Sequence, residues 1–321
     1  MNAFVNMKPY LEPVLLSVAI IAGSLSGLFI SLDTSLTDFF IIAMLFFLFY
    51  NISLSGFMKG IKNRKYISIA LLSNFVVIPI IAFFLARIFV DSSSAVFIGL
   101  MMYLIAPCTD WFLGFTKLAH GDVEINTALL PLNLLSQILL LPVYLYVFTA
   151  KSAAIPFDAF FDVLLYWVLL PFGIAQVVRF IVSRSGDSNL EKSHSLAEKG
   201  VLLSLILLVF SIFNSNIESL IANTAVIPQI FAVVFVFFVT TFFLVKLISK
   251  IAAFSRQEEV SLTMTTAARN APLMLGISLI LFPEQVLIHL VLIIGMLLEF
   301  PHLITITYLL KRKVPLNLAH T

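Results

Sequence analysis

Long apolar stretches recur along the whole chain, and this recurrence limits what the chain can fold into more than any other feature. Each stretch holds about twenty residues, which as a helix rising roughly 1.5 Å per residue would cross the hydrocarbon core of a bilayer. The sequence predicts about ten of them, at approximately 11–31, 38–58, 66–89, 95–118, 122–149, 157–183, 197–217, 226–249, 258–281 and 284–310. We therefore expect an all-α integral membrane protein with about ten transmembrane helices.

The composition leaves no material for a soluble domain. Of the 321 residues, 61% are hydrophobic and 11% are charged, far from the averages of soluble globular proteins. The polar breaks are short, so residues 1–321 are expected to form a single transmembrane domain. The sequence has no phosphate-binding loop, metal-ligating cluster or hydrolase motif, and its one cysteine, Cys108, excludes an intrachain disulfide. We expect no enzyme activity, no cofactor and no nucleic-acid partner.

The basic residues predict the orientation of the chain. Lys and Arg gather in the cytoplasmic loops of membrane proteins. With a cytoplasmic N-terminus, 16 of the 19 Lys and Arg residues fall on the cytoplasmic side, Arg87 and Lys151 fall on the other, and Arg269 lies inside a span. An even number of spans then returns the C-terminus to the cytoplasm. The expected location is the cell inner membrane, with many passes and both termini inside.

The second half of the chain echoes the first. APCTDWFLGF in the fourth span and LLLPVYLYVF at the end of the fifth correspond to ARNAPLMLGI in the ninth and LEFPHLITIT in the tenth. Two repeats of five spans, about 10–150 and about 157–311, must have opposite orientations in the membrane. Inverted repeats are typical of secondary transporters, whose sites lie near the bilayer midplane at the repeat interface.

The fourth and ninth spans contain the residues least suited to a continuous helix in lipid. Pro107 and Pro272 each remove a backbone donor, and Thr109 and Asn270 add polar side chains close to them. Irregular backbone at membrane depth is tolerated where it is buried in protein or lines a wet cavity. We expect two broken helices that cross. The alternative is a pair of proline kinks accommodated by packing.

Three ionisable residues fall inside predicted spans. Asp110 and Arg269 occupy nearly equivalent places in the two repeats, which predicts an ion pair that either contacts substrate or only fastens the crossing. Glu299 precedes Pro301 in the tenth span and could bind a proton or a cation, unless it lies at the membrane edge.

Amide side chains in the third and fifth spans add to the candidate site. Asn133 and Gln137 are four residues apart and so share a helical face, which is expected to point toward the fourth span. Asn74 lies ahead of Pro79 in the third span. These amides either contact the substrate or coupling ion, or only join helices through hydrogen bonds.

With these residues in view, the chain resembles the superfamily of bile acid:sodium symporters and arsenite permeases over nearly its full length. The likeness is carried by LIAPCTDWFLGFTKLAHGD, TTAARNAPLMLGISLILFP and LLEFPHL, and it is closest to the branch of arsenic resistance proteins. The resemblance implies a ten-span or closely related fold of inverted repeats, with the fourth and ninth spans broken at a crossing.

The resemblance also implies roles for two residues. Arsenite permeases carry a cysteine shortly after an alanine in the fourth span, matched here by Cys108, and a glutamate before a proline in the tenth, matched by Glu299. Arsenite is a neutral, thiophilic trihydroxide, so one thiol could hold it through a single exchangeable bond. Cys108 could instead be a small apolar core residue. Sodium-coupled relatives have an acidic residue and a glutamine where this chain has Thr265 and Arg269, which argues against their sodium site.

The sequence therefore predicts a secondary transporter that exports arsenite or a related oxyanion by exchange with protons or sodium. The expected substrate-binding residues are Cys108, Thr109, Asp110, Asn133, Gln137, Arg269 and Asn270, and the expected ion-coupling residues are Glu299, Asp110 and Asn74. One alternative is sodium- or proton-coupled uptake of an organic anion, which would leave Cys108 dispensable. Another is a sensory or structural membrane protein without transport.

Overall fold

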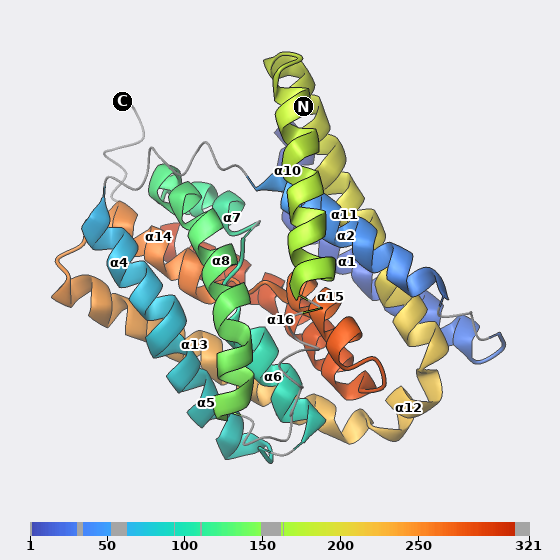
Figure 1. Cartoon of the computed structure of the whole chain (residues 1–321). Coiled ribbons are helices and arrows are strands. Elements are labelled where there is room, and N and C mark those ends of the chain that lie inside the picture. The colour runs from blue at the N-terminus through green and yellow to red at the C-terminus, as the bar shows by residue number, and fades with distance from the viewer. Residues whose placement is uncertain are drawn as a thin grey trace.

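The computed structural model describes residues 2–30, 35–52, 63–92, 94–109, 111–148, 162 and 164–311, and these residues are predominantly helical (Figure 1). Within these ranges the chain forms helices and turns, and the only β-type pairing is one isolated bridge. The expectation of an all-helical fold is confirmed for the described part of the chain.

The helices follow the order of the predicted apolar stretches. They are α1 (Asn2–Gly27), α2 (Ser35–Asn51), α4 (Arg64–Leu72), a π-helical turn (Ser73–Val77), α5 (Ile78–Phe89), α6 (Ala95–Ile105), α7 (Phe112–Leu118), α8 (Val123–Phe148), a second π-helical turn (Leu164–Leu169), α10 (Leu170–Ser183), α11 (Asp187–Ser215), α12 (Ile217–Ala222), a 3-10 turn (Thr224–Val226), α13 (Ile227–Ile251), α14 (Arg256–Ala267), α15 (Ala271–Leu281) and α16 (Val286–Lys311).

Several of these helices have the length and composition of membrane spans. In the described part of the chain, 6 helices are long and apolar enough to cross a bilayer. They are Arg64–Phe89, Val123–Phe148, Leu165–Ser183, Ser188–Ser215, Thr224–Ile251 and Val286–Lys311. Shorter apolar helices cover Leu11–Gly27, Thr37–Asn51, Ala95–Ile105 and Ala271–Leu281. The chain is a multi-pass membrane protein. Its division into ten spans and two inverted repeats stays a prediction.

Two groups of helices make up the bundle. The flanking group consists of α1, α2, α10 and α11, which pack against one another (Figure 1). The crossing group contains α4 to α8 and α13 to α16, in which α6 packs on α5 and α16, and α13 packs on α14 and α16. The groups meet where α15 packs on α2 and α1 packs on α16. Gly276 of α15 allows a close approach there, because an added Cβ would lie 3.2 Å from Met44 Cε of α2.

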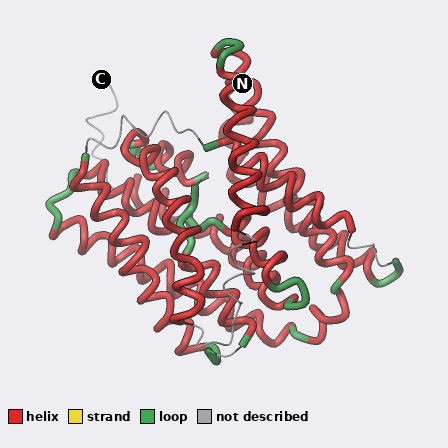
Figure 2. The backbone as a smooth tube through the Cα atoms, viewed as in Figure 1, coloured by secondary structure: helices red, strands yellow, loops and turns green. Residues whose placement is uncertain are grey.

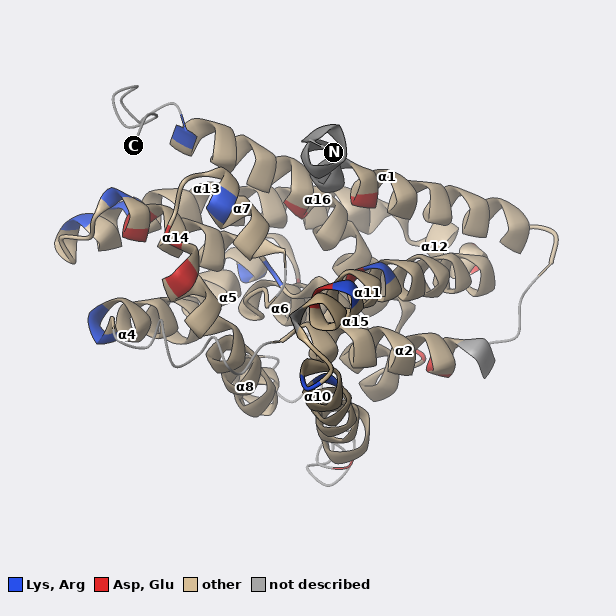
Figure 3. Ribbon diagram, turned by 90° about the horizontal axis from the view of Figure 1, so that it is seen from above, with Lys and Arg blue, Asp and Glu red and all other residues tan. Residues whose placement is uncertain are grey.

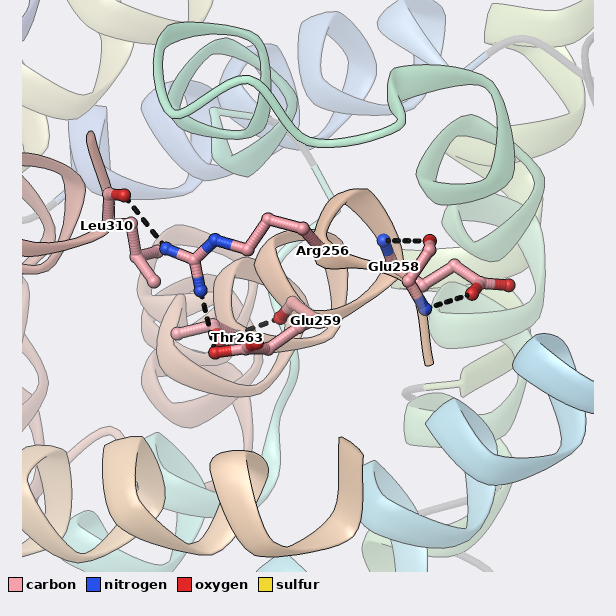
Figure 4. A network of polar contacts seen from close by, with 6 residues as sticks. Arg256, Glu258, Glu259, Thr263 and Leu310 are labelled. Carbon is pink, nitrogen blue, oxygen red and sulfur yellow. Dashed lines mark hydrogen bonds and ion pairs between the residues drawn. The ribbon is translucent and has the colours of Figure 1, made fainter. Parts of the chain in front are cut away.

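Polar side chains fix the start of α14. Ser255 Oγ accepts a hydrogen bond from the Glu258 N–H at 3.2 Å, and the Glu258 carboxylate accepts one from the Ser255 N–H at 2.8 Å, which together form a capping box (Figure 4). Arg256 donates to the Glu259 carboxylate and to the Leu310 carbonyl, each at 2.8 Å. The beginning of α14 is thereby joined to the end of α16.

A buried hydrogen-bond network ties four helices together near the same end. Tyr66 of α4 donates its hydroxyl proton to Asn126 Oδ1 of α8 at 2.7 Å. Asn126 Nδ2 donates to Thr116 Oγ1 of α7 at 2.9 Å and to the Ser261 carbonyl of α14 at 3.0 Å. Gly121 leaves room for the Thr116 side chain, because a Cβ added to this glycine would lie only 2.8 Å from Thr116 Cγ2. The network therefore joins α4, α7, α8 and α14.

Charged residues lie mainly at helix ends and in the connections between helices. Seen from above, the ribbon of the described helices is largely uncharged along its length, and Lys and Arg occur near the ends of α4 and α14 (Figure 3). This distribution fits helices that are embedded in lipid, because ionisable groups are costly at the bilayer centre. Which side of the bundle faces the cytoplasm stays a prediction.

Candidate functional site

Two interruptions of the helices meet inside the bundle, where loop segments appear among the helices (Figure 2). α6 ends at Ile105 and α7 begins at Phe112, while α14 ends at Ala267 and α15 begins at Ala271. The two segments form an isolated antiparallel bridge between Pro107 and Arg269. Both breaks therefore occur where proline and polar residues predict them, and they contact each other.

Backbone hydrogen bonds hold the two broken segments together. The Cys108 N–H donates to the Ala268 carbonyl at 3.0 Å, and the Asn270 N–H donates to the Ala106 carbonyl at 2.9 Å. These bonds satisfy backbone groups that the interrupted helices leave without partners, as burial in an apolar environment requires. We call the paired segments the crossing.

One cluster of amide and hydroxyl side chains lies beside the crossing. Asn74 Nδ2 donates to Asn133 Oδ1 at 3.4 Å and to Thr265 Oγ1 at 3.2 Å, and Asn133 Nδ2 contacts the same Thr265 oxygen at 3.3 Å. Asn74 sits in the π-helical turn Ser73–Val77, and such turns are frequent at functional sites because they redirect a side chain. All three side chains are fully buried.

A second cluster continues the first along α8. Asn270 Nδ2 donates to Thr109 Oγ1 at 3.0 Å and makes a longer contact of 3.5 Å with Gln137 Oε1. Because Asn133 and Gln137 share a face of α8, the two clusters are neighbours. The face was expected to point toward the fourth span, but its amides bond mainly to residues of the third and ninth predicted spans.

Two buried polar atoms in these clusters have no partner. Asn74 Oδ1, an acceptor, and Gln137 Nε2, a donor, make no hydrogen bond to any described residue. The side chains of Asn74 and Gln137 are 0% and 2% exposed. A buried polar group without a partner costs about 1–3 kcal/mol. The two atoms are therefore suited to a polar ligand that both donates and accepts hydrogen bonds.

Glu299 contacts the crossing from the middle of α16. Its Oε1 accepts hydrogen bonds from the Arg269 N–H and from Trp111 Nε1, each at 3.0 Å. The side chain is 0% exposed. Glu299 therefore lies within a helix rather than at its end, and its depth in the membrane stays a prediction.

Tyr103 can bond to Glu299 in two ways. Its hydroxyl oxygen lies 2.8 Å from the Gly295 carbonyl oxygen and 3.3 Å from Glu299 Oε2. A tyrosine hydroxyl has one proton to donate. If that proton goes to Gly295, the contact with Glu299 is a hydrogen bond only when the carboxyl group carries its own proton. The Tyr103 hydroxyl can therefore form a hydrogen bond with Glu299 whether the carboxyl group is protonated or deprotonated.

The Arg269 guanidinium is directed at backbone carbonyls. Nη1 donates to the Leu104 carbonyl at 2.8 Å, Nε donates to the Ala267 carbonyl at 3.4 Å, and Nη2 donates to the carbonyls of Thr265, at 3.4 Å, and of Thr266. The guanidinium makes no ion pair within 4.0 Å with a carboxylate of the described residues, although Glu299 is near enough to interact with it electrostatically.

The remaining expected site residues have different outcomes. Cys108 is 2% exposed and lies close enough to Tyr103 and Arg269 to interact with them electrostatically. Asp110 lies outside the described residues, and so does its expected pairing with Arg269. Among the described residues no group of three His, Cys, Asp or Glu side chains could hold a metal ion.

Sequence reasoning missed the aromatic partners of Glu299. Trp111 lies directly before α7, at the fourth-span break, which is a signal that could have been used, because the indole N–H of a tryptophan that is removed from water usually finds a hydrogen-bond partner. Tyr103 has no such signal, since it lies within the regular part of α6.

A comparison with protein families agrees with the membrane fold. The model of a family described as the sodium bile acid symporter family matches residues 38–223, which is more than half of the chain. No curated protein matches the chain. The matched range covers the first break and both α8 amides, and it ends before the second break.

Proposed function

The chain belongs to the sodium bile acid symporter family, and from this premise we propose that it is a secondary transporter that exports arsenite or a related oxyanion in exchange for protons or sodium. The family consists of transporters and not of enzymes, which agrees with the expectation that the chain has no enzyme activity. The observation that carries the proposal is the position of Cys108. The only cysteine of the sequence lies within the crossing, in a backbone hydrogen bond to the opposite segment.

The chemistry of a single thiol suits reversible binding of arsenite. Sulfur attacks arsenic as the thiolate, one As–S bond forms, and one hydroxyl group leaves arsenic with the thiol proton as water. The oxidation state of arsenic does not change. Attack by water on the same bond reverses the step and releases the substrate, so one thiol captures arsenite without trapping it.

The amide clusters favour an uncharged, hydroxyl-bearing substrate. Their described side chains carry no formal charge, and they leave Asn74 Oδ1 and Gln137 Nε2 without partners. Arsenite hydroxyl groups donate to an acceptor such as the first and accept from a donor such as the second. Together with Cys108, the neighbouring Thr109 and Asn270 complete the proposed substrate site.

Glu299 is the proposed coupling residue. Its carboxyl group is buried, and its bonding partners accommodate it both protonated and deprotonated. Binding of a proton at Oε2 and release on the opposite side of the membrane would link proton movement to substrate movement. Asn74 and Asp110 are further proposed members of the coupling site. The proposed location is the inner membrane with both termini in the cytoplasm.

An organic anion is the second candidate substrate, because the family is named for transport of bile acids. Such a substrate requires a cationic partner at the site, and Arg269 is the described cation at the crossing. Its guanidinium already donates to four carbonyl groups. This use of its donors favours arsenite over an organic anion.

Resistance of an arsenite-sensitive bacterial host tests the proposal. We expect Cys108→Ser and Glu299→Gln to abolish the resistance that the wild-type chain confers, with each variant present in the membrane at the wild-type level. Glu259→Gln is the matched control for the second substitution, because it removes a carboxylate from the half-exposed ion pair at the start of α14. The control should keep full resistance. Full resistance in either site variant would overturn the proposal.

A further inference from the structure

The C-terminal ends of two broken helices point at one guanidinium. The last four carbonyls of an α-helix have no partner within the helix. At the end of α14, the Arg269 guanidinium donates to the carbonyls of residues 265–267, and the Ala268 N–H donates to the Met264 carbonyl. At the end of α6, the guanidinium donates to the Leu104 carbonyl.

The two helix ends favour a cation at this place, and the Glu299 carboxyl group, when deprotonated, attracts the same guanidinium. Each helix C-terminus carries the equivalent of about half a negative elementary charge, so the ends of α6 and α14 together amount to about one unit. The guanidinium supplies one positive unit that is not lost in proteins, because arginine keeps its proton. The Arg269 side chain is 0% exposed, and its guanidinium lies over the Phe237 ring of α13 at 5.4 Å from the centroid.

In transporters with broken helices, the C-terminal ends of half-helices and the carbonyls of unwound segments are where coupling cations bind. We propose that the Arg269 guanidinium is a built-in cation that occupies this place, so the crossing of this chain binds no sodium and transport does not depend on it. Arg269 is thus a positioning residue that holds α6 and α14 together.

The donors of Arg269 leave little capacity for another role. A guanidinium has five N–H donors, and the bonds to Leu104, Thr265, Thr266 and Ala267 engage all three of its nitrogens. A sodium ion would have to displace the guanidinium from the same carbonyls. This role of Arg269 rests on the proposed function only because the crossing is taken as the transport site. Of the two proposed coupling ions, protons and sodium, it leaves the proton.

The wild-type protein gives the first test, without any substrate. Purified protein is unfolded by heat in sodium chloride and in choline chloride of equal ionic strength. A cation that binds only the folded state raises the unfolding temperature. We expect the same temperature in both salts. A higher temperature in sodium would overturn the proposal, and this result does not depend on whether arsenite is the substrate.

Arg269→Ala gives the second test, because it removes the cation and leaves the carbonyls. We expect a lower unfolding temperature than wild type, and recovery with millimolar guanidinium chloride, far below its denaturing range, but not with choline chloride. Arg256→Ala is the matched control, since it deletes a half-exposed arginine that bonds one carbonyl and one carboxylate. It should show no recovery with guanidinium.

Arg269→Lys keeps the positive charge but has fewer N–H donors. Without added guanidinium, its unfolding temperature should lie between those of the wild type and of Arg269→Ala. Recovery of Arg256→Ala to the same extent as Arg269→Ala, or wild-type stability of Arg269→Ala without added cation, would contradict the inference. If Arg269→Ala cannot be purified, the inference is tested by the unfolding temperature of Arg269→Lys and by the comparison of sodium chloride with choline chloride on the wild type.

Discussion

At the scale of single residues, the crossing separates charges from neutral polar groups. Glu299 receives donors from Trp111 and from the Arg269 backbone, whereas the Arg269 side chain turns to carbonyls. The side chains of the amide clusters bond to one another and to hydroxyl groups, and not to the side chains of Glu299 or Arg269. The carboxyl group of Glu299 keeps neutral hydrogen-bond donors around it, although it also interacts electrostatically with the guanidinium.

Tyr103→Phe tests this arrangement, because it removes only the hydroxyl between Glu299 and Gly295. A hydrogen bond to a charged group contributes about 1.5–3 kcal/mol. We expect slower transport and a changed dependence of the transport rate on pH, measured as flux in vesicles over a series of pH values. Tyr50→Phe is the control, since its hydroxyl donates to Ser193 Oγ at 2.6 Å between the flanking helices α2 and α11. A pH profile of Tyr103→Phe that matches the wild type would contradict the role of Glu299.

The sequence predicted the chemistry-bearing residues better than it predicted their partners. Charged residues are rare inside membrane spans, so Arg269 and Glu299 could be singled out from their positions alone, and Pro107 from the polar residues that follow it. Tyrosine is one of several aromatic residues that are common in this chain, with 8 Tyr and 32 Phe, so nothing marked Tyr103. Which donor Glu299 bonds depends on the packing of α6 against α16, and that packing is not encoded in any local pattern.

At the scale of helices, each interruption has a local cause. Pro107 cannot donate a backbone hydrogen bond, and the Ala106 carbonyl and Cys108 N–H beside it pair with the opposite segment. The π-helical turn that carries Asn74 had no clear sequence signal except Pro79, which follows it. The positions of the breaks could therefore be predicted, whereas the turn that aims Asn74 at Thr265 could not.

Asn126→Ala tests the network that joins α4, α7, α8 and α14. The substitution leaves the Tyr66 hydroxyl and the Ser261 carbonyl without their buried partner, which costs about 1–3 kcal/mol. We expect a lower unfolding temperature in detergent. Asn223→Ala removes an exposed hydrogen bond to the Ser219 carbonyl and should leave the unfolding temperature nearly unchanged. Equal temperatures for the two variants would show that the network does not stabilise the bundle.

At the scale of the whole molecule, the site is closed. Cys108, Asn133, Asn270 and Glu299 are all at most 3% exposed, so a substrate reaches them only when the bundle opens. The flanking and crossing groups meet at few places, chiefly α15 on α2 and α1 on α16. Movement of one group against the other is the expected route of opening, as in transporters that rock one bundle about a fixed site.

The predicted orientation can be measured across the whole chain. Fusions of a reporter that is active only in the cytoplasm, placed after Lys117 and after Lys311, should be active, and a fusion after Lys151 should be inactive. The reason is the concentration of Lys and Arg on one side, which sets the orientation of short loops. Activity at all three places, or the opposite pattern, would contradict a topology with a cytoplasmic C-terminus.

The most direct test of the central claim is counterflow of arsenite into proteoliposomes that contain the purified wild-type chain. The account predicts exchange of arsenite in the absence of sodium, no exchange in the Cys108→Ser variant, and no comparable exchange of a bile acid. Bile acid exchange that requires sodium, with no movement of arsenite, would contradict it.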